Sequence, residues 1–288
     1  MKILLTKIII TGIITLQIVT NVSSQENTVN PIPDKHLTFG AGYSQLMLLD
    51  KQVSPLIYKA HFFPVSLEYT KKTYNGMMNF KFKLANGFTG PKHFKERDRL
   101  IIYTDNNGVF QEYIYTMKNN YIVLNEINFE YVWKINSLTN DKTSFYVGGQ
   151  TKQFFLFSFT DVPLFVHNEL SINPSFVATY ELMGLKCLSR ISFFAVGAIT
   201  KLPYSNNPVD GEHNYFVSTF RMGTEFSTIK DYQRINLHQS IMKTINNKWA
   251  IGLNYNFYWY SCPRYNNSKA YNNSFSLIFT RKLQSNEK

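Results

Sequence analysis

The chain has 288 residues, of which 44% are hydrophobic and 16% aromatic, and its formal net charge is +11. Two cysteines, Cys187 and Cys262, are too few for a disulfide framework or a cysteine-based metal cluster. The mean hydropathy of −0.21, with no later apolar run of about 18 residues, excludes a protein built of transmembrane helices.

The first 24 residues have the pattern of an export signal. Lys2 and Lys7 give a positive start, Ile8 to Val19 form a mostly apolar core, and small residues precede Gln25. Removing this segment lowers the net charge from +11 to +9. We therefore expect a cleaved signal peptide at residues 1–24, followed by a polar, proline-containing periplasmic lead-in at residues 25–35.

Alternating apolar and polar residues predict a series of β-strands from His36 onward. Residues 86–107 are charged and glycine-rich and predict a long external loop, residues 161–172 are ambiguous, and residues 201–213 predict another loop. The predicted strands, in chain order, are Leu37–Ser44, Leu56–Thr70, Met78–Leu84, a weak one at Val109–Met117, Ile127–Ile135, Phe145–Phe159, Phe176–Leu182, Leu188–Thr200, Phe216–Phe226, Ile235–Ile241, Trp249–Trp259 and Ser274–Thr280.

The segment W-A-I-G-L-N-Y-N-F-Y-W from Trp249 to Trp259 shows the pattern most clearly. Its odd positions are large and apolar, and its even positions are mostly small or polar. Ten residue steps of about 3.3 Å, tilted by roughly 40°, project to about 25 Å, which is the height of the apolar band of an outer-membrane barrel. Trp133, Trp249 and Trp259 are predicted at the membrane interfaces, where indole rings are favoured.

These features predict an all-β protein, a closed antiparallel transmembrane β-barrel of about twelve strands. Ten or fourteen strands are the alternatives, because a barrel of hairpins with both ends on one side needs an even number. We expect one barrel domain at residues 36–283, a polar C-terminal tail at residues 284–288, and no sizeable helix after the signal peptide. Both cysteines fall in predicted turns, and one disulfide or two free thiols remain open.

The export signal, the alternating strands and the closing segments N-N-K-W-A-I-G-L-N-Y-N-F-Y-W and N-S-F-S-L-I-F-T-R-K-L resemble Gram-negative outer-membrane β-barrel proteins. The likeness covers roughly His36 to Leu283 and is strongest to Bacteroidota-type barrels, many of which have no assigned function. It implies an outer-membrane location, contact with lipid and lipopolysaccharide, and insertion by the barrel-assembly machinery. The polar tail departs from the pattern, because such chains often end at an aromatic residue that this machinery recognises.

The faces opposite the apolar ones carry charged and amide side chains. These residues either give a basic lining that favours anionic solutes or pair with one another and fill the bore, and we favour the second interpretation. The predicted lumen-lining residues are Lys81, Lys83, Glu130, Lys134, Arg221, Glu225, Arg234, Asn254 and Asn256.

The one catalytic candidate is Asn236-Leu237-His238-Gln239-Ser240. His238 and Ser240 are two residues apart on a predicted strand, so they share a face and suit a nucleophile and its base. The spacing is similar to the His-x-Ser of lipid A deacylase barrels, and a Ser/His/Asn trio resembles the outer-membrane phospholipases. However, no acidic residue lies between Asp231 and Glu287, and the apolar neighbours turn the pair towards the lumen.

We therefore expect no enzyme, but a passive outer-membrane barrel: a narrow pore, or a structural or surface-interaction protein. A membrane-lipid hydrolase using Ser240 and His238 is the alternative, and a soluble secreted β-protein is a third possibility. We expect no cofactor and no metal, and no nucleic-acid partner because the basic residues are dispersed. The oligomeric state and any solute stay open.

Overall fold

The computed structural model describes residues 34–51, 56–92, 98–104, 108, 110–116, 120–140, 142–159, 166–201, 217, 220–221, 223–264 and 268–283. The signal segment and the tail lie outside these residues. Its strands are β1 (Asp34–Leu49), β2 (Ile57–Lys72), β3 (Gly76–Pro91), β4 (Asp98–Thr104), β5 (Phe110–Thr116), β6 (Asn120–Lys134), β7 (Thr143–Phe159), β8 (Val166–Leu182), β9 (Leu185–Phe193), β10 (Val196–Lys201), β11 (Thr224–Thr228), β12 (Gln233–Thr244), β13 (Trp249–Cys262) and β14 (Ser268–Leu283).

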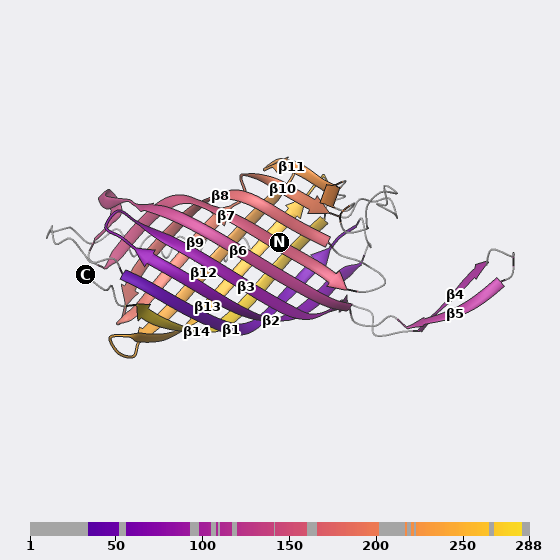
Figure 1. Cartoon of the computed structure of the whole chain (residues 1–288), viewed down its shortest axis with the longest axis horizontal. Coiled ribbons are helices and arrows are strands. Elements are labelled where there is room, and N and C mark those ends of the chain that lie inside the picture. Colours follow the sequence, from indigo (N-terminus) through magenta and orange to yellow (C-terminus); the bar gives the residue numbers. More distant parts are fainter. Residues whose placement is uncertain are drawn as a thin grey trace.

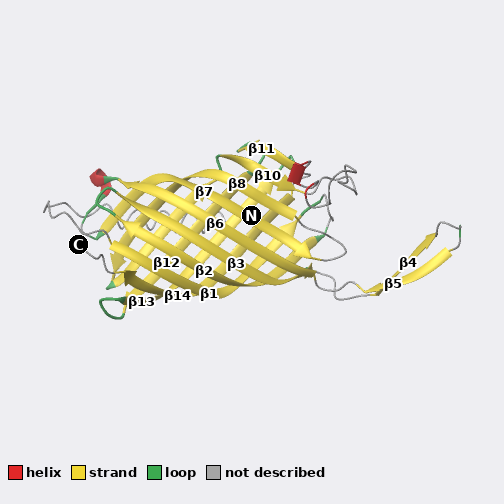
Figure 2. Ribbon diagram, in the orientation of Figure 1, coloured by secondary structure: helices red, strands yellow, loops and turns green. Residues whose placement is uncertain are grey.

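Ten of these strands close into a cylinder (Figures 1 and 2). The hydrogen-bonded order is β8-β7-β6-β3-β2-β1-β14-β13-β12-β9, and β9 pairs with β8 again. All pairings are antiparallel, and the first and last strands meet along fifteen residue pairs from Lys35–Leu283 to Leu49–Lys269. The predicted fold class, a closed antiparallel β-barrel, is confirmed.

The strands β10 and β11 extend two of the ring strands instead of adding new ones. Along β8, Ser175 pairs with Ser192 of β9 and Ile172 pairs with Val196 of β10, so β10 continues β9 after a bulge. In the same way, β11 pairs with β10 while β12 pairs with β9. At the first interruption, residues 194–195, the Phe194 amide donates to the Arg234 carbonyl of β12 at 3.0 Å. At the second, residues 229–232, the Asp231 and Tyr232 amides donate to the Thr228 carbonyl at 3.0 and 2.9 Å.

The prediction of twelve strands counted two segments that lie outside the ring. The weak segment Val109–Met117 contains β5, which pairs only with β4 among the described residues. Among the described residues of the segment Phe216–Phe226, those from Thr224 onward form a strand, the five-residue β11 (Thr224–Thr228). The ring therefore has the ten strands that the sequence analysis kept as an alternative, and the ambiguous segment 161–172 contains the start of β8.

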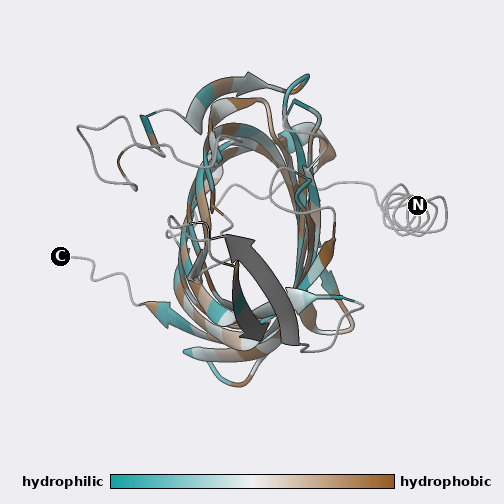
Figure 3. Ribbon diagram, turned by 90° about the vertical axis from the view of Figure 1, so that its right-hand side faces the viewer, coloured by the Kyte–Doolittle hydropathy of each residue, from teal (hydrophilic) through white to brown (hydrophobic). Residues whose placement is uncertain are grey.

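The large apolar side chains face outwards, and the bore is lined mainly by polar side chains with an internal apolar group. In β3, Phe80 and Phe82 are 44% and 37% exposed, whereas the intervening Lys81 is 5% exposed. Looking along the cylinder, Figure 3 shows this alternation of hydrophobic and hydrophilic residues around the closed wall. This is the arrangement of a membrane barrel, and a soluble sandwich, in which the apolar faces converge, does not describe it.

The two ends of the barrel differ in their connections. At the terminus end, where β1 begins and β14 ends, the connections are short, such as the turn at Met183-Gly184, where both residues have positive φ. A short 3-10 helix, η1 (Asn136–Leu138), lies in the β6–β7 turn at this end. At the far end the connections are longer, and the β4–β5 ribbon projects away from the cylinder (Figure 1).

Both cysteines lie on strands, not in turns, and towards opposite ends. Cys187 pairs with Ile241 near the terminus end, and Cys262 pairs with Ser268 at the far end. Both are free thiols, so the alternative of a disulfide between them is wrong. In the part of the chain that the structure describes, no helix has the length and apolar character needed to cross a membrane.

Candidate functional site: the lumen of the barrel

The middle of the bore is filled by buried ion pairs between distant strands. Arg190 of β9 lies 2.9 Å from the Glu130 carboxylate of β6 and 3.9 Å from that of Glu68 on β2. Glu68 also lies 3.7 Å from the Lys81 ammonium, and Ser175 donates a hydrogen bond to Glu130. These contacts link five strands, β2, β3, β6, β8 and β9, through the interior of the cylinder.

A second ionic group lies nearer the far end. Arg234 and Glu169 form an ion pair with 2.6 Å between Nη1 and Oε2. The guanidinium lies over the rings of Phe154 and Tyr258, at 4.3 and 4.6 Å from their centroids, which adds cation–π attraction. Tyr232 donates a further hydrogen bond of 2.8 Å to Glu169. A planar cation is thus enclosed between aromatic faces and a carboxylate.

Nearer the far end than this ionic group, an apolar cluster lies inside the bore. Tyr232 and Phe194 belong to the two strand interruptions, and their rings meet at 4.8 Å, nearly perpendicular to each other. His167 stacks on Tyr260 at 4.8 Å. The cluster consists of Leu46, Leu48, Tyr58, Ala60, Phe62, Ala85, Ile122, Leu124, Phe154, Leu156, Phe194, Ile199, Tyr232, Tyr258, Tyr260, Cys262 and Ala270, none more than 4% exposed.

Most of the predicted lumen residues lie inside the bore. Lys81, Lys83, Glu130, Arg234 and Asn254 are buried there, and Asn256 lies beside them, hydrogen-bonded to His238.

Three of the predicted lumen residues lie elsewhere. Lys134 is at the end of β6, with its ammonium 5.9 Å from the ring of Tyr74 in the adjoining turn. Arg221 precedes β11, outside the strands formed by the described residues, and is exposed. Glu225 lies at the far rim, where its carboxylate is 3.1 Å from Arg264.

The catalytic candidates are inside the barrel but do not form a triad. His238 Nδ1 hydrogen-bonds to the Asn256 Oδ1 at 2.7 Å. No hydrogen bond joins His238 to Ser240 among the described residues, and Asn236 accepts a hydrogen bond from Arg234 instead. Ser240 is buried and faces the lumen, so it has no access to membrane lipid.

Several lumen residues were missed by the sequence analysis. Glu68, Glu126, Lys152, Glu169 and Arg190 all belong to the ionic groups, and Lys152 lies 3.1 Å from Glu126. Their inward positions follow from the period of two in their strands, so the signal was present. Tyr232 gave no such signal, because it lies in the turn between β11 and β12.

The predicted interface tryptophans are on the outer surface at both ends of the barrel. Trp249 and Trp133 lie near the terminus end and are exposed, and Arg281 lies over the Trp249 ring at 5.5 Å. Trp259 is ten residues further along β13, towards the far end, and is partly buried. Among the described residues, no group of three or more His, Cys, Asp or Glu side chains is arranged to hold a metal ion.

No protein-family model and no curated protein matches this chain. Among solved structures, it is similar to outer membrane protease OmpT from Escherichia coli, with 8% identity over 92% of this chain and 100% of that chain and a TM-score of 0.46. It is also similar to an outer membrane channel from Pseudomonas putida F1 (9% identity, 91% and 100% covered, TM-score 0.43) and to Neisserial surface protein A (7%, 88% and 100%, 0.33). Likenesses this distant carry no conclusion about function, so we infer function from the barrel itself.

Proposed function

We propose that this protein is an outer-membrane β-barrel with a sealed bore, serving as a structural or surface-interaction protein and not as an open pore. The exposed apolar side chains around the cylinder support a membrane location, since water would solvate them poorly. The short connections at the terminus end match the periplasmic side of such barrels, and the longer ones match the cell surface.

The observation that carries the proposal is the water-excluded layer across the bore. Leu46, Phe62, Ile122, Phe154 and Tyr232 come from different parts of the wall, and each has 0% of its surface exposed. A solvated channel leaves its lining side chains accessible to water, so a layer with no accessible surface blocks the passage of ions. The Arg234–Glu169 pair directly beneath it is equally buried.

The β4–β5 ribbon supports a role at the cell surface. It extends beyond the far end of the barrel and forms a sheet of only two strands (Figure 1). A two-stranded ribbon alone in water is marginally stable, so contact with another surface would stabilise it. Lipopolysaccharide around the rim is one such surface. We further propose that the barrel-assembly machinery inserts the protein into a Gram-negative, Bacteroidota-type outer membrane.

The test is single-channel recording of the refolded protein in a planar bilayer. We expect no steady conductance from the wild type, with insertion verified by the mobility shift of folded barrels in unheated gel samples. The double variant Phe154→Ala/Tyr258→Ala, which removes two rings from the sealing layer, is expected to give current steps. Phe82→Ala, on the outer face, is the matched control and should stay silent. Steady wild-type conductance overturns the proposal.

We propose no enzymatic activity, and the lipid-hydrolase alternative finds no support in the position of Ser240. That side chain is enclosed by the barrel wall, whereas a hydrolase of membrane lipid needs its nucleophile to meet the lipid. Release of fatty acid from phospholipid or lipid A by the wild type, and its loss in Ser240→Ala, would contradict this part of the proposal.

A further inference from the structure

The terminus end of the bore contains a cavity that the sealed layer and the ionic groups do not fill. Its volume is about 540 Å³, within the range of small-molecule sites. The strands β1, β2, β7, β8, β9, β12, β13 and β14 supply its walls, and the turn at residues 246–248 lies at its mouth. His238 and Ser240 lie among its lining residues, together with Glu68.

The lining of this cavity carries more positive than negative charge. Five lysines line it, Lys72, Lys142, Lys186, Lys248 and Lys282, against the three carboxylates of Asp34, Glu68 and Glu181. The Glu68 carboxylate already forms ion pairs with Lys81 and Arg190, deeper in the bore. The Asp34 carboxylate lies 3.0 Å from the Lys282 ammonium and 2.8 Å from Nε2 of His36.

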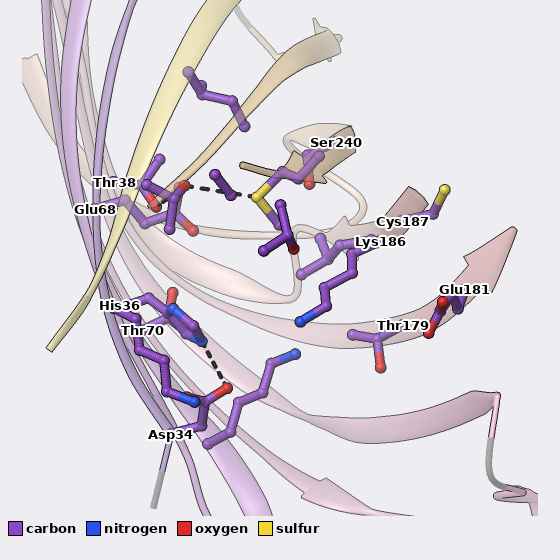
Figure 4. A pocket seen from close by; sticks show the side chains of 18 of the residues that line it. Asp34, His36, Thr38, Glu68, Thr70, Thr179, Glu181, Lys186, Cys187 and Ser240 are labelled. Carbon is purple, nitrogen blue, oxygen red and sulfur yellow. Dashed lines mark hydrogen bonds and ion pairs between the residues drawn. The ribbon is translucent and has the colours of Figure 1, made fainter. Parts of the chain in front are cut away.

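Four of the five lysines have no ion pair among the described residues, and two of these four lie on ring strands, Lys72 on β2 and Lys186 on β9. Figure 4 shows Lys186 extending across the cavity towards Asp34 and His36, with Glu181 on the other side of it, away from the ammonium group. Lys72 interacts with the Asp34 carboxylate, which also serves Lys282 and His36, and it is near enough to Lys186 for the two positive charges to repel each other. The fold thus holds two like charges on separate walls of one partly enclosed space.

Such an arrangement is unfavourable when empty and favourable when an anion lies between the two ammonium groups. Each ammonium offers three N–H donors, and the hydroxyl groups of Thr70 and Thr179 on the same walls offer more. A doubly charged group with several acceptor oxygens uses these donors best.

We propose that this cavity is a binding site for a small dianionic solute, a phosphate monoester of about the size of glycerol phosphate, entering from the terminus end. The ammonium groups of Lys72 and Lys186 bind its phosphate from opposite walls. The neutral part of the solute lies against Thr38, Thr280 and Ser240, deeper in the cavity. This site does not depend on the sealed layer, which lies in the other half of the bore.

The test is isothermal titration calorimetry of the refolded full-length barrel in a neutral detergent. We expect binding of glycerol 3-phosphate, no binding of glycerol, and weaker binding at higher ionic strength, because the attraction is between charges. The double variant Lys72→Gln/Lys186→Gln should weaken binding at least about tenfold, since each lost charge-assisted contact is costly. Lys230→Gln, an exposed lysine in the turn between β11 and β12, is the control and should bind as the wild type does.

Other outcomes have defined meanings. Equal binding of succinate shows that the site recognises the double charge and not the phosphorus, which keeps the site but removes its selectivity for phosphate. Absence of heat with glycerol 3-phosphate, equal binding of glycerol, or wild-type affinity in the double variant overturns the proposal. Unheated gel mobility of each variant verifies that it is folded, so a loss of binding is not a loss of the barrel.

Discussion

Arg234 and Glu169 meet at 2.6 Å inside the barrel, and neither side chain has any exposed surface. They come from β12 and β8, strands that are separated in the ring by β9. The pair therefore links two strands that are not hydrogen-bonded to each other in the ring. Because both charges are removed from water, each depends on the other for its solvation.

Removing one partner of this pair should cost more stability than removing both. We expect Arg234→Met to lower the free energy of unfolding by about 3–5 kcal/mol, because it leaves the Glu169 carboxylate buried and unpaired. The double variant Arg234→Met/Glu169→Leu should recover much of that loss. Denaturant unfolding in lipid vesicles, followed by tryptophan fluorescence, measures both, and a double variant less stable than the single one would contradict the explanation.

The depth of an outward residue should decide what a charge costs there. Leu253, in the middle of β13, and Ile245, in the turn before it, are 62% and 63% exposed. We expect Leu253→Arg to destabilise the barrel in lipid by about 2–4 kcal/mol and Ile245→Arg by at most about 1 kcal/mol. Equal losses, measured by the same unfolding assay, would mean that no apolar band surrounds this strand.

The thiols should remain unlinked under oxidising conditions. Cys262 is fully buried, with its sulfur 3.5 Å from the Asp231 carbonyl oxygen, and Cys187 lies near the other end. We expect intact-mass measurement after air oxidation to show two free thiols. Maleimide labelling should be slow in the folded barrel and fast after unfolding, and a monomer two mass units lighter would disprove the separation of the cysteines.

Acid should loosen the turn that places Tyr232 in the bore. The Thr228 amide and hydroxyl donate to the Asp231 carboxylate at 3.2 and 3.1 Å, and these hydrogen bonds lower the pKa of Asp231. A lowered pKa means that the stabilisation is present above the ordinary value of about 3.9 and is lost as the pH falls through the folded-state pKa. Hydrogen exchange across residues 228–233, compared with Asp231→Asn at each pH, should show a difference that disappears in acid.

The period of two in the sequence predicted the faces of the strands well. The lysines at 81 and 83 and the phenylalanines at 80 and 82 take opposite sides of the wall, because consecutive strand residues always do. The number of ring strands was harder to predict, because the alternation in Val109–Met117 says nothing about its partner. That segment pairs with β4 beyond the barrel, and only the pairing in space excludes it from the ring.

The sequence predicted that charged residues would lie in the lumen, but it did not predict which of them would pair. Glu130 and Arg234 were expected inside, yet Glu130 meets Arg190 and Arg234 meets Glu169, each more than fifty positions away in the chain. Which charges meet depends on the register and tilt of the whole cylinder. The two strand interruptions that bring Phe194 and Tyr232 inwards have no local signature either, since a bulge is defined by its neighbouring strand.

The seam between β1 and β14 has a consequence for biogenesis. β1 and β14 are neighbours in the ring. One edge of β1 therefore has unpaired backbone N–H and C=O groups until the sixteen-residue β14 pairs with it. The barrel can therefore close only after β14 has been made. Until then, the proteins that carry the unfolded chain to the membrane have to protect the free edge of β1 from pairing with other strands.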